Sequence, residues 1–252
     1  MACTHTSLPT LIRPAVPAAL VSSLACTAAL SNAYSHRWYD ERNQFLPDGL
    51  PAAAVHEFFL AEVGGVRYLP QAFIISGIAR ALTARKITVW IGRDNWPTPY
   101  ALPDDLRAHA YFLNPQSEKQ YLWALDAALR SPAVRAVITH HERLPFTLSQ
   151  RFALTARSSG VIGIFTRPAR LLGTPSAAPF RWQVSPVVHV PESRSWQVTL
   201  LKAKQSLPQN NTWIVNYEDE TFSLRISPAL VNRSSEEFIA AHDTKKFAAG
   251  GG

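Results

Sequence analysis

A turn that follows an apolar strand is the first place where this sequence could do chemistry. Residues 56–60 are an apolar run, residues 62–65 form a turn, and Pro70 opens a segment with apolar residues at helical spacing. Such a unit often holds a phosphate at the helix N-terminus. That chemistry requires G-x-x-x-x-G-K-[ST], but no glycine here is followed by Gly-Lys at that spacing. The architecture therefore predicts a phosphate site, and the residues argue against one.

The degenerate loop contains four residues of interest: Glu62, Gly64, Gly65 and Arg67. Arg67 could bind an anion without help, but we expect that it does not. Glu62 and the two glycines could instead contact a partner protein. We therefore expect no bound cofactor at this loop.

His140, His141 and Glu142 follow a buried strand, at the edge of the sheet where α/β proteins place their sites. Neighbouring side chains point apart, so adjacent histidines rarely share a metal, and no H-x-x-x-H or H-E-x-x-H helix is present. We interpret the three residues as polar groups at a strand end and expect no metal site. A P-loop enzyme would also carry a magnesium-binding Asp here, and this strand end has none.

No nucleophile has the sequence context that catalysis needs. Ser149 lacks a G-x-S-x-G elbow, so we interpret it as a helix-start residue. We find no catalytic triad, no paired carboxylates in one motif and no cysteine in the expected core. The prediction is a protein that is not an enzyme.

Aromatic and basic residues alternate on the later strands and form the best candidate for contact with DNA or a partner. Such a face can stack bases and hold phosphates. The alternative is that the tryptophans fill the space between sheet and core. The candidate contact residues are Arg181, Trp182, Trp196, Lys202 and Lys204, with Trp213 nearby.

The elements that must position these residues form two patterns. Apolar runs at 87–91, 110–113, 133–138 and 161–165 alternate with helical patterns, which predicts a mostly parallel sheet with helices on both faces. The first helical pattern begins at Pro70 and ends near Arg85 and Lys86. The others cover 104–108, 118–130, with Asn114 and Ser117 as cap candidates, and 147–158, with Gly160 as the stop.

After Pro168 the pattern changes to alternating polar and apolar residues, which predicts an antiparallel extension. Its expected strands cover 180–190, 196–204, 212–217 and 221–226, with a hairpin turn at 218–220. The predicted organisation is a variable leader over 1–44, partly disordered, a core over 45–168, the extension over 169–231 and a flexible tail over 232–252.

Composition and charge bound the class of protein. At 252 residues with 47% apolar content, the chain can build one large core. The net charge of +7 is spread out, with no run of five like charges, so the signal for nucleic-acid binding is weak. Cys3 and Cys26 are too few for a disulfide scaffold and point to a reducing compartment.

The N-terminal segment is apolar over 15–33 and resembles a signal peptide in part. Pro14, Pro17 and several hydroxyl residues interrupt it, and the run is too short and too polar to span a membrane. A helix over 18–30 could dock on the core or on a partner. We expect a cytoplasmic protein.

Six stretches together resemble the RecA-like ImuA family and its relative SulA. They occur in order over residues 47–204: LPDGLPAAAVHEF, KITVWIG, EKQYLWALDAALRSPAVRAVI, LSQRFALTARSSGVIGIFTRP, PSAAPFRWQVSP and WQVTLLKAK. The matching residues are Leu50, Pro51, His56, Glu57, Trp123, Ala124, Leu125, Ser149, Arg151, Pro175, Ser176, Arg181 and Trp182. The leader and the loop over 95–103 do not match.

The resemblance implies a truncated RecA-like domain without a working ATPase. Proteins of the ImuA kind act in the bacterial SOS response to DNA damage, with a Y-family polymerase-like partner, ImuB, and an error-prone polymerase, in mutagenic translesion DNA synthesis. Proteins of the SulA kind are cell division inhibitors that block FtsZ. The expectation is a non-catalytic adaptor with at most weak DNA contact. The alternatives are an FtsZ-binding inhibitor and a RecA-like ATPase with a non-standard loop.

Overall fold

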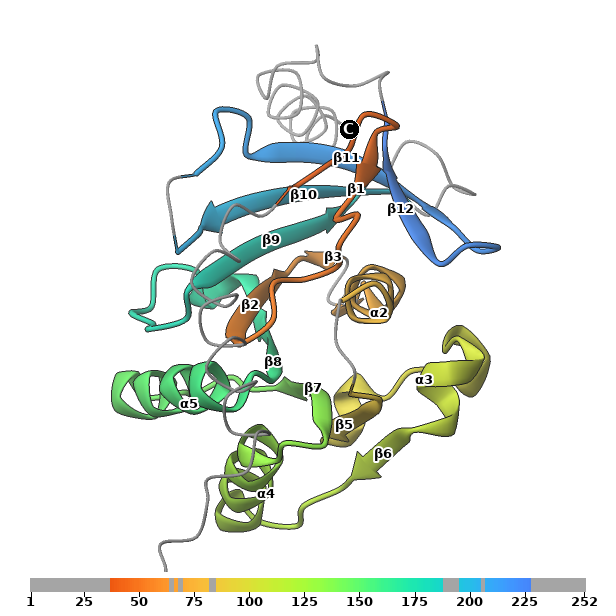
Figure 1. Ribbon diagram of the computed structural model, residues 1–252. Helices are drawn as coiled ribbons and strands as arrows, with labels where there is room; N and C mark the ends of the chain where they lie inside the picture. The colour runs from red at the N-terminus through yellow and green to blue at the C-terminus, as the bar shows by residue number, and fades with distance from the viewer. Residues whose placement is uncertain are drawn as a thin grey trace, which may run out of the picture. The chain divides into compact units, whose positions relative to one another are not determined.

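In the part of the chain that the structure describes, ten strands form one mixed sheet (Figure 1). The structure is a computed structural model, and it describes residues 37–63, 66–67, 70–81, 85–187, 195–204 and 207–227. These residues belong to one compact unit that begins at residue 36. The strand order is β1-β12-β11-β10-β9-β2-β8-β7-β5-β6.

One half of the sheet is parallel. Every neighbouring pair from β9 to β6 runs in the same direction. These strands are β2 (Ala54–Leu60), β5 (Ile87–Ile91), β6 (Ala110–Leu113), β7 (Val134–His140), β8 (Ile162–Pro168) and β9 (Phe180–Pro186). Parallel strands need crossovers, and the helices between them supply these.

The other half is antiparallel and continues from β9 to the second edge of the sheet. Its strands are β10 (Ser195–Lys202), β11 (Thr212–Glu218), β12 (Ser223–Ile226) and the two-residue β1 (Gln44–Phe45). β1 was not predicted, because it lies in the segment expected to be a leader. The antiparallel extension predicted after residue 168 is present in the described residues.

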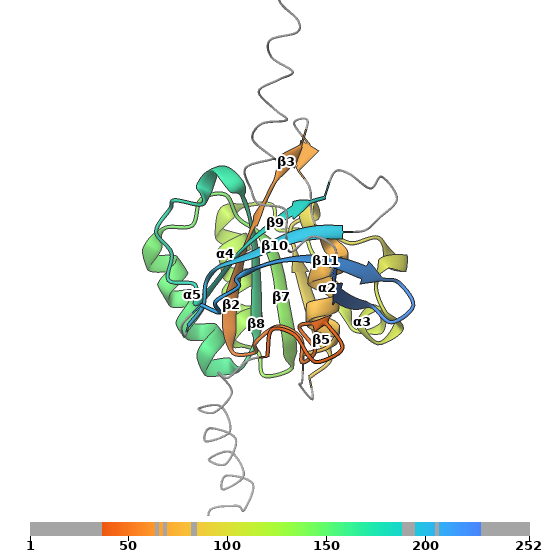
Figure 2. The same cartoon turned by 90° about the horizontal axis from the view of Figure 1, so that it is seen from above.

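Helices cover both faces of the sheet, as predicted, with α4 and α5 on one face and α2 on the other (Figure 2). The helices are α2 (Gln71–Ala79), α3 (Asp104–Ala108), α4 (Glu118–Arg130) and α5 (Phe146–Ser159). Short 3₁₀ turns lie at η1 (Arg93–Asn95), η2 (Pro99–Ala101) and η3 (Ala169–Leu171).

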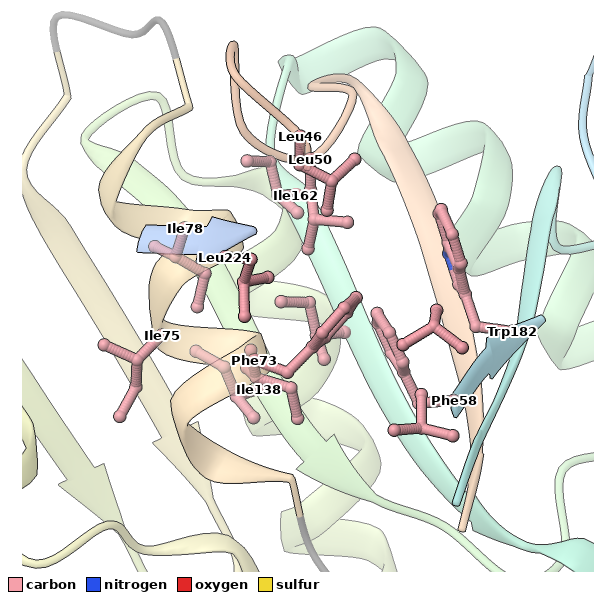
Figure 3. Close-up of a cluster of buried hydrophobic side chains, with 14 of the residues drawn as sticks. Leu46, Leu50, Phe58, Phe73, Ile75, Ile78, Ile138, Ile162, Trp182 and Leu224 are labelled. Carbon is pink, nitrogen blue, oxygen red and sulfur yellow. The ribbon is translucent and has the colours of Figure 1, made fainter. Parts of the chain in front are cut away.

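The larger core cluster lies between α2 and the sheet. Phe73 and Ile78 of α2 face Phe58, Ile138 and Ile162 of the parallel strands (Figure 3). Leu224 of β12 joins the same cluster beside α2, so the antiparallel half helps to enclose this helix (Figure 3). The second cluster lies under α4 and α5, where Leu125 and Phe152 meet alternate residues of the same strands.

The predicted bounds of several elements are confirmed to the residue: β5, α3, β6 and α4. Gly160 ends α5 with φ of 78°, in the left-handed conformation that favours glycine. Ser117 caps α4 by accepting a hydrogen bond from the Gln120 N–H at 3.3 Å.

The predicted end of the first helix is wrong. α2 ends at Ala79, well before Arg85 and Lys86. The Leu50 N–H bonds the Gly77 carbonyl at 2.9 Å, and Gly49 lies directly against the backbone of Ala81. The segment before β2 therefore occupies the end of this helix. The predicted helix over 18–30 and the predicted tail over 232–252 lie outside the described residues.

No helix in the described part of the chain is both long and apolar enough to cross a membrane.

Candidate functional site

The parallel strands end together at one edge of the sheet. Ile91 is level with Thr139, His140 with Thr166, and Leu60 with Pro168. The loop between β2 and α2 and the turn η1 leave from this same edge. Sites in open α/β sheets lie outside the carboxyl ends of the strands, so this edge is the first candidate.

A buried hydrogen-bond network joins two strand ends and the turn η1 on the α2 side of this edge. The Thr166 hydroxyl donates to Asn95 Oδ1 at 2.9 Å and contacts His140 Nδ1 at 3.1 Å. Asn95 is 1% exposed, and its Nδ2 has no hydrogen-bond partner among the described residues. The network therefore links η1, β7 and β8 through the Thr166 hydroxyl.

A second network lies on the α4 side. The Tyr121 hydroxyl bonds the Thr139 hydroxyl and donates to the His140 carbonyl at 3.1 Å. Thr139 also donates to the Ile91 carbonyl at 3.2 Å. Burial raises the pKa of Tyr121 to about 12, although the bond to Thr139 opposes this. Tyr121 is thus a neutral donor at ordinary pH.

His141 and Glu142 lie just beyond these networks. The His141 N–H bonds the Thr166 carbonyl at 3.0 Å, and its ring lies 5.3 Å from that of Tyr121. Burial first, and then the Arg167 charge, hold the pKa of His141 below its usual value. Glu142 pairs with Arg170 at 3.2 Å. Glu142 Oε1 also lies 4.0 Å from His140 Nε2, so Glu142 contacts both Arg170 and His140, whereas the His141 ring packs against Tyr121.

The degenerate loop is a small hairpin rather than a simple turn. Its two-residue strands, β3 (Glu62–Val63) and β4 (Val66–Arg67), pair antiparallel, and Gly64 and Gly65 between them lie outside the described residues. α2 then begins without a side-chain cap. Gln71 Nε2 donates to the Trp96 carbonyl at 3.0 Å, which ties this helix start to η1.

A buried carboxylate with two arginines lies on the α5 side of β2. Glu57 is 0% exposed, and its oxygens bond Arg167 Nη1 and Arg181 Nε, each at 3.1 Å. The Arg181 guanidinium also lies 4.6 Å from the centre of the Phe59 ring. Two cations thus face one anion in a region from which water is largely excluded.

A serine pair extends this cluster to α5. Ser176 donates to Glu57 Oε1 at 2.7 Å, and its hydroxyl contacts the Ser149 hydroxyl at 2.9 Å. Ser149 in turn accepts the Ala177 N–H at 2.9 Å. Ser149 is therefore an anchor for the loop before β9, consistent with its interpretation as a structural residue at the start of a helix.

The structure divides the predicted aromatic and basic face between two sides of the sheet. Trp182 and Trp196 are 0% and 3% exposed and belong to the α2 cluster, with Trp213 beside them. Arg181 points to the other side, where it binds Glu57 and the carbonyls of Leu172 and Thr174.

The buried indoles cannot stack on a base without leaving the core, so the packing alternative accounts for them. Of the five candidate contact residues, Lys202 and Lys204 are exposed. Lys202 Nζ lies 3.4 Å from the Ser176 carbonyl. Among the described residues, this face therefore offers no continuous surface for base stacking and phosphate binding.

Sequence reasoning missed Asn95, Thr166 and the ion cluster at Glu57. Glu57 and Arg181 are 124 positions apart, and no local pattern signals their contact. A charged residue inside the apolar strand 54–60 was the one available signal, because buried carboxylates require partners.

No clustering of His, Cys, Asp and Glu suited to a metal ion occurs among the described residues. Comparison with protein-family models finds no match, and neither does comparison with curated proteins.

Proposed function

We propose that this protein is a RecA-like, non-catalytic adaptor of the ImuA kind, acting in SOS-induced mutagenic translesion DNA synthesis in the cytoplasm. It works by contacts with a Y-family polymerase-like partner and an error-prone polymerase. The parallel sheet with helices on both faces and an antiparallel continuation is compatible with the RecA-like fold that the sequence resemblance implies.

The main support is that several residues that carry the sequence resemblance contact one another in the folded chain. Glu57, Ser149, Ser176 and Arg181 come from separate stretches of the sequence and form one bonded cluster. His56 and Trp182 form a further pair, because the Trp182 Nε1–H donates to His56 Nδ1 at 3.2 Å. These residues connect strands and loops of the sheet. The residues that carry the resemblance therefore have structural contacts, which fits a shared fold rather than a shared catalytic site.

The carboxyl edge of the sheet supports the absence of ATP hydrolysis. Thr139 and His140 end β7, where a P-loop enzyme would place a magnesium-binding Asp. Their side chains bond Tyr121 and Thr166, which are neutral groups of the protein itself. An adaptor does not need that edge for chemistry.

A direct test is recovery of partners from damaged cells. The tagged full chain is expressed at its native level, cross-linked after ultraviolet irradiation and purified, with unirradiated cells as the control. We expect polymerase components, enriched after irradiation. Recovery of FtsZ without any polymerase component would overturn the proposal in favour of a division inhibitor.

A nucleotide assay separates the adaptor from a RecA-like ATPase. Millimolar ATP with magnesium should leave the melting temperature of the full chain unchanged, because the sequence after β2 has no P-loop lysine and β7 ends in Thr139 and His140 rather than an Asp. A clear rise in melting temperature together with phosphate release would establish the ATPase alternative.

DNA contact, if made, belongs to the phosphate backbone. Lys202 and Lys204 are exposed, whereas the nearby indoles are buried. Contacts from lysines alone carry no base specificity and weaken steeply with salt. Binding to single-stranded DNA should therefore be weak and independent of sequence, and its affinity should fall about 7- to 50-fold between 50 and 200 mM salt, as expected for about two to four phosphate contacts.

A further inference from the structure

β6 is an open edge of the sheet. Among the described residues it pairs with β5 alone, through bonds such as Thr88 N–H to the His109 carbonyl and Gly92 N–H to the Leu113 carbonyl. Backbone groups of successive strand residues point to opposite sides. The N–H and C=O groups of Ala110 and Phe112 therefore point outward from the sheet.

The side chains of this strand are unusually exposed for their type. Tyr111, Phe112 and Leu113 are 57%, 40% and 39% exposed. The Phe112 ring packs edge-to-face against Trp96, with the ring centres 5.4 Å apart. The strand contains no charge, proline or glycine, which are the residues that normally protect an edge from pairing.

The opposite edge of the sheet is protected. β1 has two residues, and the chain folds back across it so that Tyr39 bridges Phe45. The Leu46 N–H bonds the Trp38 carbonyl at 2.9 Å to close this turn. Among the described residues, the chain therefore covers the β1 edge of the sheet and leaves the apolar strand β6 without a second pairing strand.

Charge at the open edge is balanced, unlike the net +7 of the whole chain. The exposed charged residues of the segments that flank β5 and β6 are four cations and four anions. They are Lys86, Arg93, Asp94, Asp104, Asp105, Arg107, Glu118 and Lys119. A strand whose flanking segments also have no net charge can approach this edge without electrostatic repulsion. A second copy of this chain meets that condition.

We propose that β6 pairs with β6 of a second copy, antiparallel about a two-fold axis, to form a continuous sheet through two molecules. The outward N–H and C=O groups of Ala110 then bond those of Phe112 in the other copy, and Phe112 bonds Ala110 of the other copy in the same way. This register gives two hydrogen-bonded residue pairs. A register shifted by two residues leaves only one such pair within the strand. Tyr111 therefore lies on the axis, opposite its own copy.

This register predicts which cysteine cross-links. Residues directly opposite at a non-hydrogen-bonded position have Cα atoms about 4.5 Å apart, which suits a disulfide. Residue 112 lies about 7–8 Å from its copy across the diagonal, which does not. In the full chain with Cys3→Ser and Cys26→Ser, oxidised Tyr111→Cys should form a covalent dimer. The matched Phe112→Cys should form no covalent dimer.

Sedimentation velocity tests the dimer without cross-linking. The wild-type chain should dimerise with rising concentration, and Tyr111→Lys, which places two lysines face to face, should shift the midpoint at least tenfold. Trp123→Lys, on an exposed α4 residue 73% open to solvent, is the control and should not. A wild-type chain that stays monomeric at 100 μM, or a disulfide at 112 in preference to 111, would overturn the proposal. The proposed adaptor function does not depend on this result.

Discussion

At the scale of single residues, the buried ion cluster has the largest expected effect on stability. Glu57→Gln keeps the shape of the side chain but leaves Arg167 and Arg181 without their anion. Arg167 is 2% exposed, so its charge cannot be solvated in place. Removing one partner of a buried ion pair typically costs about 3–5 kcal/mol. We expect a loss of that size in the free energy of unfolding, measured by urea denaturation.

The matched control is Asp104→Asn, which breaks an exposed pair with Arg107. The Asp104 side chain is 90% exposed, and exposed pairs contribute about 0–1 kcal/mol. If the two variants lose similar amounts of stability, Glu57 does not anchor the sheet as described.

His141 makes stability depend on pH. Burial and the Arg167 charge depress its folded pKa, so the folded state binds its proton less readily than the unfolded chain does. Its contribution is fully present above the unfolded pKa of about 6.5 and is lost as pH falls through the folded value. The wild-type chain should therefore lose stability below about pH 6.5, and His141→Gln should flatten that part of the profile.

Urea midpoints measured between pH 5 and pH 8 test this assignment. An unchanged slope for His141→Gln would show that other groups carry the pH dependence.

At the scale of elements, Gly49 fixes where the segment before β2 meets α2. Its φ is 76°, and an added Cβ would lie 2.3 Å from the Ala81 nitrogen. A residue with a Cβ is strained at this positive φ. The contact cannot be relieved by turning a side chain, because the nearest atoms, those of Arg80 and Ala81, belong to the backbone. Gly49→Ala should lower the free energy of unfolding by more than about 2 kcal/mol.

Gly173→Ala is the matched control, because an added Cβ there has no atom within 4 Å. It should change stability by less than about 0.5 kcal/mol. Equal effects at both glycines, measured by urea denaturation, would show that the close contact at Ala81 does not determine the end of α2.

Elements with local signals were predictable from the sequence. β5 is an apolar run bounded by a lysine and a glycine, and α4 has a serine cap and a clear apolar face, so both bounds are confirmed to the residue. The end of α2 was not predictable, because it depends on Gly49 and Leu50, which approach from a different segment. β1 has two residues and gives no periodicity to detect.

The candidate site was predictable in location but not in content. The alternation of strands and helices predicts that the strand ends share one edge. His140 lies at that edge, but as the last residue of β7 rather than after a strand that ends at residue 138. The bond between Thr166 and Asn95 joins residues 71 positions apart, and the contacts of Glu57 span still more of the chain. Such contacts depend on the register of the sheet, which a single sequence does not specify.

At the scale of the whole molecule, the buried polar residues described above bond one strand or loop to another. Apolar residues are exposed on β6 and α4. Trp123 and Tyr111 are both more than half exposed. The proposed adaptor role would use exposed side chains of this kind to contact a partner.

The most direct test of the proposed adaptor role is the frequency of mutations after DNA damage. A strain without this gene is compared with the parent strain and with the strain complemented by the full chain, after the same dose of ultraviolet light. The account predicts that deletion reduces induced mutations to near the unirradiated level and that complementation restores them. An unchanged mutation frequency, with loss of division arrest after damage, would contradict it and identify a division inhibitor.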